Sequence, residues 1–266
     1  MKTIVFDGRA FAGEKIEELK IISAGLKSRG IIPHLSSILI GDDEASRLYV
    51  SLKKKAAERI GAELDPYFLP EKVDLPTVIT LIESLNMDEN IHGIMVQLPV
   101  PGELGSHKEE IIGAINSGKD VDGLRQDSLF LHPTSKAVMS ILHEAESRLS
   151  IKNIKSVCVV GATGMVGKPL VKELKNEGYK VLEANAKTEN LKDLTGIADV
   201  VISATGVSGI IKPDMVKSGL IAIDVGSPHG DIDPAVEKKA LFFTPVPGGV
   251  GPVTISCLLE NLIEAC

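Results

Sequence analysis

The sequence predicts an α/β protein with parallel sheets, folded as two α/β domains that flank a cleft. Apolar runs of strand length alternate with segments of helical period throughout the chain, which is typical of parallel α/β architecture. The 266 residues suit one large or two modest domains, and a new pattern begins after about residue 120. We expect ligands at the carboxyl ends of the strands, where the crevices of such sheets lie.

The first half of the chain alternates predicted strands with predicted helices. Residues 35–40 form an apolar run that predicts a buried strand. Residues 45–60 have the period of a helix, and Gly61 follows as a stop signal. A second helix is predicted at 75–85, then a strand at 93–98 and a break at Pro99-Val-Pro101.

The second half repeats this alternation. A short β-type run at 156–160 leads into a glycine-rich turn, and a helix at 168–177 closes at Gly178. Further strands are predicted at 181–183, 199–203 and 220–225.

Composition narrows the class of protein. The 29 basic and 36 acidic residues give a net charge of −7, and the chain has no Trp, so neither charge nor stacking platforms favour a nucleic-acid partner. Neither a signal peptide nor a membrane span is visible, so we expect a soluble cytoplasmic protein with no membrane partner. The three cysteines show no metal or redox spacing, and we expect them to be reduced, with no metal bound.

The turn after the strand at 156–160 carries three glycines, Gly161, Gly164 and Gly167. Glycines between a strand and a helix let the backbone approach a pyrophosphate, which the helix N-terminus attracts. The spacing departs from the usual G-x-G-x-x-G, and a tight turn without a ligand is the alternative. The context favours a Rossmann-like dinucleotide-binding domain.

Residues 244–254, Thr-Pro-Val-Pro-Gly-Gly-Val-Gly-Pro-Val-Thr, carry three prolines and three glycines, an order that no ordinary helix or strand would carry. Glycine permits close approach to a flat ligand and proline fixes the backbone, so the run predicts a shaped loop. A simple turn between elements is the alternative.

Tyr49 and Lys53 lie four residues apart in the predicted helix 45–60, which places the phenol and the ammonium on one face. The run Lys53-Lys54-Lys55 could equally be a solvated face.

Five segments together resemble the bifunctional methylenetetrahydrofolate dehydrogenase/cyclohydrolase family. They are Ser46-x-x-Tyr49-x-x-x-Lys53-x-Lys55-Ala56-Ala57, Gln97-Leu98-Pro99-Val100-Pro101, Lys119-Asp120-Val121-Asp122-Gly123, the turn Gly161 to Pro169, and the loop 244–254. The resemblance covers nearly the whole chain. It implies a catalytic, folate-binding domain of residues 1–119 plus 246–266, with the last helix at about 256–266 packing back on it, and a nucleotide-binding domain of residues 120–245. A homodimer is likewise implied.

The resemblance also implies the roles of the site residues. Hydration of a methenyl bridge needs a group that removes a proton from water and delivers one to nitrogen, and the family's lysine at Lys53 is that group. Gln97 would hydrogen-bond Lys53, Tyr49 would orient the folate, and the carboxylate of Asp122 would hold the pterin's amino-pyrimidine edge. The loop residues that would contact the substrate are Pro247, Gly248, Gly249 and Val250.

A nicotinamide dinucleotide is the implied cofactor, with a tetrahydrofolate derivative as substrate. Ala162 and Thr163 stand where the family has Arg and Ser, and that Arg is expected to bind the 2′-phosphate of NADP. We predict NADP by analogy, with Lys187 as a replacement cation, and NAD with Glu183 on the ribose as the alternative. The implied cofactor-binding residues are Gly161, Ala162, Thr163, Gly164, Met165, Val166, Gly167, Ala204, Val225 and Thr254.

The resemblance weakens between residues 124 and 135. The family has Phe-His-Pro and a longer loop to Pro-Cys-Thr-Pro, whereas this chain takes a shorter path to His132-Pro-Thr-Ser135. A loop histidine without a visible partner is not our choice of catalytic base. The alternatives to a bifunctional enzyme are a folate dehydrogenase that has lost the hydrolysis step and a non-catalytic, nucleotide-sensing relative.

Overall fold

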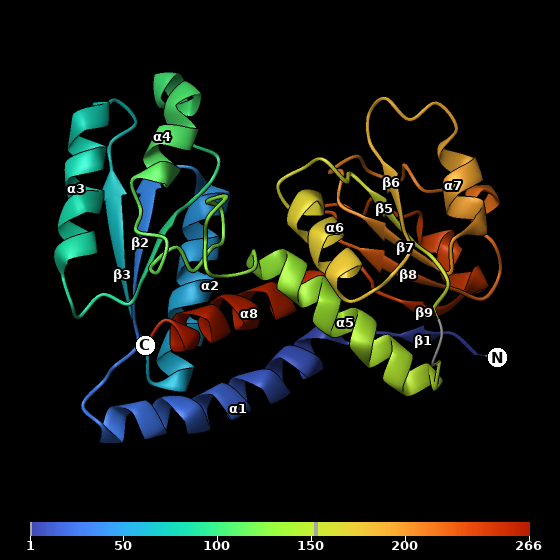
Figure 1. The fold of residues 1–266 in the computed structure, drawn as a ribbon, viewed down its shortest axis with the longest axis horizontal. Coiled ribbons are helices and arrows are strands. Elements are labelled where there is room, and N and C mark those ends of the chain that lie inside the picture. Colours follow the sequence, from blue (N-terminus) through green and yellow to red (C-terminus); the bar gives the residue numbers. More distant parts are fainter. Residues whose placement is uncertain (1, 152–153) are drawn as a thin grey trace. The chain divides into compact units, whose positions relative to one another are not determined.

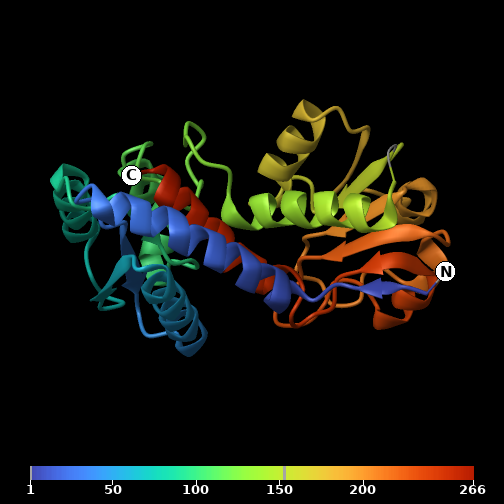
Figure 2. The same ribbon diagram turned by 90° about the horizontal axis from the view of Figure 1, so that it is seen from below.

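The computed structural model describes residues 2–151 and 154–266, and it divides into two compact units. We call them the six-stranded unit, Met1–Ala12 with Thr134–Thr254, and the three-stranded unit, Gly13–Pro133 with Ile255–Cys266. The predicted class, two α/β domains with parallel sheets, is confirmed (Figures 1 and 2). In the described residues, no helix has both the length and the apolar character of a membrane span.

The domain boundaries differ from the predicted ones. Residues 1–12 belong to the six-stranded unit because Ile4 and Val5 pair with Phe242 and Phe243 of that sheet. Residues 120–133 belong to the three-stranded unit, which the sequence prediction had ended at residue 119. Backbone pairing between distant segments sets the first of these boundaries, and composition carries no signal for it.

The three-stranded unit has one parallel sheet of order β3-β2-β4, with β2 in the centre. Every residue of β2 after His34 is buried, which agrees with a central strand covered on both faces. The elements that lie wholly or mainly in this unit are α1 (Gly8–Ser28), β2 (His34–Ile40), α2 (Glu44–Ile60), β3 (Glu63–Leu69), α3 (Leu75–Met87), β4 (Gly93–Val96), η1 (Gly102–His107), α4 (Lys108–Gly113) and α8 (Val250–Glu264).

Local signals set the limits of α2. The Asp43 carboxylate accepts a hydrogen bond from the Ser46 amide at 2.7 Å, which satisfies a free donor of the first turn. Gly61 closes the helix with φ 77°, the left-handed conformation that glycine adopts without strain. The predicted helix at 45–60 is therefore confirmed to within one residue.

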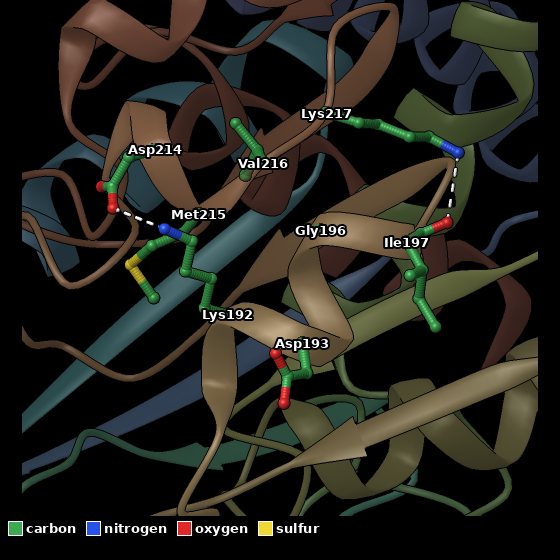
Figure 3. A pocket seen from close by; sticks show the side chains of 8 residues that line it. All are labelled: Lys192, Asp193, Gly196, Ile197, Asp214, Met215, Val216 and Lys217. Carbon is green, nitrogen blue, oxygen red and sulfur yellow. Dashed lines mark hydrogen bonds and ion pairs between the residues drawn. The ribbon is translucent and has the colours of Figure 1, made fainter.

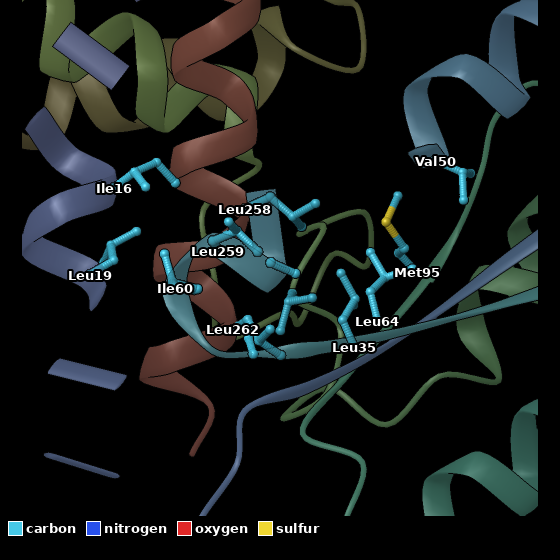
Figure 4. Packing of buried hydrophobic residues seen from close by; sticks show 13 residues of the cluster. Ile16, Leu19, Leu35, Val50, Ile60, Leu64, Met95, Leu258, Leu259 and Leu262 are labelled. Carbon is cyan, nitrogen blue, oxygen red and sulfur yellow. The ribbon is translucent and has the colours of Figure 1, made fainter. Parts of the chain in front are cut away.

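The core of this unit joins segments that are far apart in the chain (Figure 4). Ile16 and Leu19 of α1 and Leu258, Leu259 and Leu262 of α8 belong to one buried cluster with Leu35, Leu64 and Met95 of the sheet. The predicted return of the last helix to this unit is thus observed for residues 255–266.

The six-stranded unit has a parallel sheet of order β1-β9-β8-β7-β5-β6. The chain proceeds from β5 to β6 on one side and continues through β7, β8 and β9 on the other, so the strand order switches at β5. The elements are β1 (Ile4–Val5), α5 (Pro133–Leu149), β5 (Val157–Val160), α6 (Gly167–Asn176), β6 (Val181–Ala184), α7 (Leu191–Ile197), β7 (Val200–Ser203), η2 (Pro213–Met215), β8 (Leu220–Asp224), η3 (Pro234–Lys239) and β9 (Ala240–Phe243).

One prediction about the loop 244–254 is wrong. Helix α8 begins at Val250, six residues before the predicted start, and so includes Gly251 and Pro252. Proline is tolerated there because the first amides of a helix have no intrahelical acceptor, and its fixed φ suits the helix. The shaped loop is limited to the residues before Val250.

Candidate functional site

Lys53 and Gln97 form a hydrogen-bonded pair in the three-stranded unit. The Lys53 Nζ lies 2.9 Å from Gln97 Oε1 and 3.6 Å from the sulfur of Met95. Helix α2 presents the lysine, and Gln97 directly follows β4, so both stand at the carboxyl end of that strand. Burial lowers the pKa of Lys53, and the negative charge of Asp122 partly opposes this. The pair brings a readily deprotonated amine and an acceptor together.

The three lysines of the run 53–55 are not equivalent. Lys54 and Lys55 are exposed, whereas Lys53 is partly buried against β4. Tyr49, one turn before Lys53 on α2, is 42% exposed, so much of its ring faces solvent. Lys54 and Lys55 therefore lie on a solvated face of α2, whereas Lys53 contacts Met95 and Gln97.

Asp122 lies in a turn of residues 120–123 that the Gly123 amide closes by donating to the Asp120 carbonyl at 3.0 Å. The Asp120 carboxylate accepts a hydrogen bond from the Arg125 amide at 2.8 Å, and the Ser128 hydroxyl donates to the Asp120 carbonyl at 3.0 Å. Burial raises the pKa of Asp120 to about 6. Asp122 is partly exposed, and its charge acts on both Lys53 and Asp120. Lys53 is thus hydrogen-bonded to Gln97 and lies within the electrostatic influence of Asp122.

Arg125 holds the shortened loop closed. Its guanidinium donates twice to the Asp127 carboxylate, at 2.8 and 2.9 Å, and it also donates to the carbonyl oxygens of Ile115, at 2.8 Å, and Gly113. The fork of the guanidinium can make these bonds simultaneously. The short path from 124 to 131 thus has its own anchor.

His132 lies closer to the predicted site than the sequence indicated. Its side chain is buried, with 7% exposed. Burial lowers the pKa of His132, while Asp122 raises it and Lys53 lowers it further. The backbone explains the placement, because a Cβ at Gly123 would lie 2.6 Å from the His132 amide nitrogen. Only the folded loop brings residues 122 and 132 together, so the sequence carried no signal for this neighbour.

Asn261 of α8 connects the two sides of that loop. It is fully buried, and its Nδ2 donates to the carbonyl oxygens of Val121 and Leu131, both at 2.9 Å. One side chain thus satisfies two backbone groups that flank the segment carrying Asp122.

We predict that Asn261→Ala lowers the free energy of unfolding by about 2 to 4 kcal/mol, because two buried carbonyl groups lose their donor. Urea unfolding followed by circular dichroism measures the change. Asn90→Ala, which removes an exposed amide that donates to Asp88, is the control and should change stability by less than about 0.5 kcal/mol. Equal losses in the two variants would contradict this role for Asn261.

The glycine turn of the six-stranded unit stands at the switch in strand order. Gly161 has φ 89°, and a Cβ there would lie 2.4 Å from the Ala204 carbonyl oxygen. A Cβ at Gly167 would lie 2.1 Å from the Gly161 carbonyl oxygen. Two of the three glycines are thus required by close backbone packing, while Gly164 is exposed.

The start of α6 has no side-chain cap, although the Lys168 amide donates to the Gly164 carbonyl at 2.9 Å. Val166 precedes the helix without a side-chain cap, so the first amides have no side-chain acceptor. Thr163, Gly164 and Met165 are exposed beside it. Ala162 is buried, with 3% exposed, and its amide donates to the Ala184 carbonyl at 3.0 Å. The turn fits a pyrophosphate group, but position 162 supplies no cation.

The remaining predicted residues of this unit fall in three places. Ala204 and Val225 directly follow β7 and β8, at the same sheet edge as Gly161. Thr254 lies in the second turn of α8. In the loop 244–249, the Gly8 amide donates to the Gly248 carbonyl at 3.0 Å, and a Cβ at Gly8 would lie 1.8 Å from the Gly249 carbonyl oxygen. The segment Pro247 to Val250 is therefore shaped by contact with the start of α1.

A hollow of about 460 Å³ lies elsewhere, between α7 and η2 (Figure 3). Two lysines of this hollow form ion pairs: Lys192 lies 2.9 Å from the Asp214 carboxylate, and Lys217 lies 2.5 Å from the Asp199 carboxylate. The residues that line it are Lys192, Asp193, Gly196, Ile197, Asp214, Met215, Val216 and Lys217, and the predicted site residues are not among them.

Comparison with known proteins agrees with this geometry. Residues 6–122 match the model of the catalytic domain of tetrahydrofolate dehydrogenase/cyclohydrolase, and residues 132–266 match the model of its NAD(P)-binding domain.

Two kinds of relative extend the match to the full chain. The chain is 39% identical to the bifunctional protein FolD of Lactobacillus acidophilus, over 98% of this chain and 96% of that protein. Its structure resembles that of the bifunctional enzyme FolD from Campylobacter jejuni, with a TM-score of 0.92, 38% identity and coverage of 99% and 98%. It also resembles the FolD enzyme of Trypanosoma brucei complexed with NADP and an inhibitor, with a TM-score of 0.90, 33% identity and coverage of 100% and 97%. The chain therefore belongs to the tetrahydrofolate dehydrogenase/cyclohydrolase family.

Proposed function

We propose that this protein oxidises 5,10-methylenetetrahydrofolate to 5,10-methenyltetrahydrofolate with a nicotinamide dinucleotide and hydrolyses the product to 10-formyltetrahydrofolate. The hydrogen bond between Lys53 and Gln97 carries this proposal. It holds in place a lysine whose pKa is lowered by burial. Family membership and the glycine turn support the dehydrogenase half.

In the hydrolysis, the neutral amine of Lys53 accepts a proton as water attacks the methenyl carbon. The same group returns a proton to the ring nitrogen when the carbon–nitrogen bond breaks. Gln97 accepts a hydrogen bond from Nζ and so directs the amine, while burial favours its neutral form. Retention of this pair favours two activities over a dehydrogenase alone.

In the oxidation, a bound dinucleotide supplies the hydride acceptor, and the protein supplies position and electrostatics. The residues that would hold the pyrophosphate are those of the turn Gly161 to Gly167, at the uncapped start of α6. Asp122 would accept two parallel N–H donors from the amino-pyrimidine edge of the folate, and Tyr49 would orient the rest of the substrate. Pro247 to Val250 would contact the substrate as a fixed wall.

The finer proposal is a preference for NADP. Glu183, which could accept from a free ribose hydroxyl, is paired with Lys175 at 2.6 Å. Lys187 follows β6 in a turn in which its amide donates to the Asn185 side chain at 2.9 Å. A cation just past that strand can attract the 2′-phosphate, the role that Ala162 cannot fill.

We predict that Lys187→Ala reduces the ratio of kcat/KM for NADP to that for NAD by about 10-fold, the value of one charge-assisted contact of about 1.4 kcal/mol. Dehydrogenase assays with each cofactor measure the ratio. Lys172→Ala, at an exposed position of α6, is the control and should leave the ratio unchanged. An unchanged ratio in Lys187→Ala would remove Lys187 from cofactor selection.

Absorbance-monitored turnover of 5,10-methylenetetrahydrofolate tests the function as a whole. Reduced cofactor and methenyl product should appear together, and added methenyltetrahydrofolate should be hydrolysed without cofactor. Absence of both reactions would leave the alternative of a non-catalytic relative.

We also propose that the protein forms a homodimer, as the family resemblance implies. Light scattering in solution would test this.

A further inference from the structure

A buried carboxylate, Asp231, accepts hydrogen bonds from the end of β7 and from the loop that follows it. Its Oδ2 accepts hydrogen bonds from the Ser203 hydroxyl at 3.0 Å, the Thr205 amide at 2.6 Å and the Thr205 hydroxyl at 2.9 Å. The Gly206 amide donates to the same oxygen at 3.3 Å. Asp231 is fully buried, and these four donors compensate Oδ2 for its lost hydration, whereas Oδ1 has no hydrogen-bond partner among the described residues.

A second buried carboxylate fixes Asp231 in turn. Asp224, the last residue of β8, accepts from the amides of Asp231 at 3.0 Å and Ile232 at 2.8 Å, and from Gly226 at 2.8 Å. The packing is tight, because a Cβ at Gly226 would lie 2.7 Å from Asp231 Oδ1. The two acids thus connect the loops after β7 and β8 through backbone amides.

This connected loop borders the glycine turn. The Ala204 amide donates to the Val160 carbonyl at 2.9 Å, and a Cβ at Gly161 would meet the Ala204 carbonyl oxygen at 2.4 Å and the Thr205 methyl carbon at 3.4 Å. Residues 204–206 therefore form one side of the turn that receives the dinucleotide in the proposed function.

We propose that Asp231 is a positioning residue for dinucleotide binding: it fixes the backbone of residues 204–206 against the glycine turn without touching the cofactor itself. The inference rests on the proposed function of the turn. An oxygen acceptor at this position is the essential feature, because the backbone amides of Thr205 and Gly206 converge on a single oxygen. Nothing in this role involves Lys53 or Gln97, which belong to the other compact unit.

The test compares three variants of the full chain by direct titration with NADP and NAD and by the hydrolysis of methenyltetrahydrofolate without cofactor. Asp231→Ala should raise the Kd for the bound dinucleotide and the dehydrogenase KM for it at least 10-fold, with hydrolysis within twofold of wild type. Asp231→Asn should recover most of the affinity, because its amide oxygen can accept the same amides. Asp233→Asn is the matched control, since Asp233 caps η3 by accepting from the Ala235 amide and Asn caps equally well.

The outcomes separate the inference from the proposed function. Wild-type affinity in Asp231→Ala, or a parallel loss of hydrolysis and binding in folded Asp231→Ala, would overturn the positioning role while leaving the function intact. A wild-type protein that binds neither dinucleotide would overturn both. If Asp231→Ala does not fold, Ser203→Ala removes one donor to the same oxygen, and a twofold to threefold rise in Kd is then expected. An unchanged Kd in Ser203→Ala would count against the role.

Discussion

Lys53→Met should reduce the hydrolysis of methenyltetrahydrofolate by about 10² to 10⁴, the usual contribution of general acid–base catalysis. Methionine approximates the aliphatic part of lysine but carries no proton. Dinucleotide affinity should not change, because the glycine turn belongs to the other unit. Hydride transfer needs no proton carrier, so dehydrogenase turnover should persist.

Lys54→Met is the matched control for this substitution. The two lysines are neighbours on α2, but Lys54 is exposed. Loss of the same charge there should leave hydrolysis within twofold of wild type. Hydrolysis at the wild-type rate in Lys53→Met would exclude Lys53 as the proton carrier.

The pH dependence of hydrolysis follows from the same lysine. Burial lowers the pKa of Lys53, so the reactive neutral amine forms at a lower pH than in a solvated lysine. The rate should rise with pH and level off below the range in which lysines ordinarily titrate, about pH 10.4. The same shift affects stability: because the unfolded chain binds the proton more tightly, the free energy of unfolding decreases as the pH falls from about 10.4 toward the lowered pKa of folded Lys53. Lys53→Met removes this decrease and should remove the rise in rate.

Gly161→Ala should abolish dinucleotide binding and dehydrogenase activity. The new Cβ would lie 2.4 Å from the Ala204 carbonyl oxygen, a distance that the two backbones can relieve only by moving apart. The positive φ adds about 1 to 2 kcal/mol of strain. Together these displace the turn at the start of α6. Titration with NADP and NAD should show at least a 100-fold rise in Kd.

Gly178→Ala separates strain from packing. Gly178 also has φ 89°, but a Cβ there meets no atom within 4 Å. It should lower stability by about 1 to 2 kcal/mol and leave dinucleotide binding unchanged. Similar Kd values in the two variants would mean that close contact with Ala204 is not what the turn requires.

Several elements could be predicted because local chemistry determines them. The helix around Lys53 has a cap at Asp43 and a stop at Gly61, and β5, β7 and β8 are buried strands that are apolar except for a polar last residue in β7 and β8. Strand β3 was missed since its sequence, Glu-Leu-Asp-Pro-Tyr-Phe-Leu, carries two acids and a proline, which a strand at the edge of the sheet tolerates.

The remaining features depend on contacts across long stretches of chain. Asp231 reaches Ser203 over 28 residues, and Asn261 reaches Val121 over 140. Asp231 stands in no motif with a recognisable spacing. His132 differs again, because its proximity to Asp122 depends on how the shortened loop closes. Sequence patterns report local periodicity, and such tertiary contacts lie beyond that range.

The pairing of β1 with β9 has a consequence for the order of folding during synthesis. Residues 4 and 5 leave the ribosome early but find their partners only when residues 242 and 243 have emerged. The packing of the three-stranded unit is also delayed, because its core includes Leu258, Leu259 and Leu262. Contacts of such separation form slowly and leave apolar surface exposed in the meantime. The six-stranded sheet cannot be completed before residues 242 and 243 have been made, and the core of the three-stranded unit cannot be completed before residue 262 has been made.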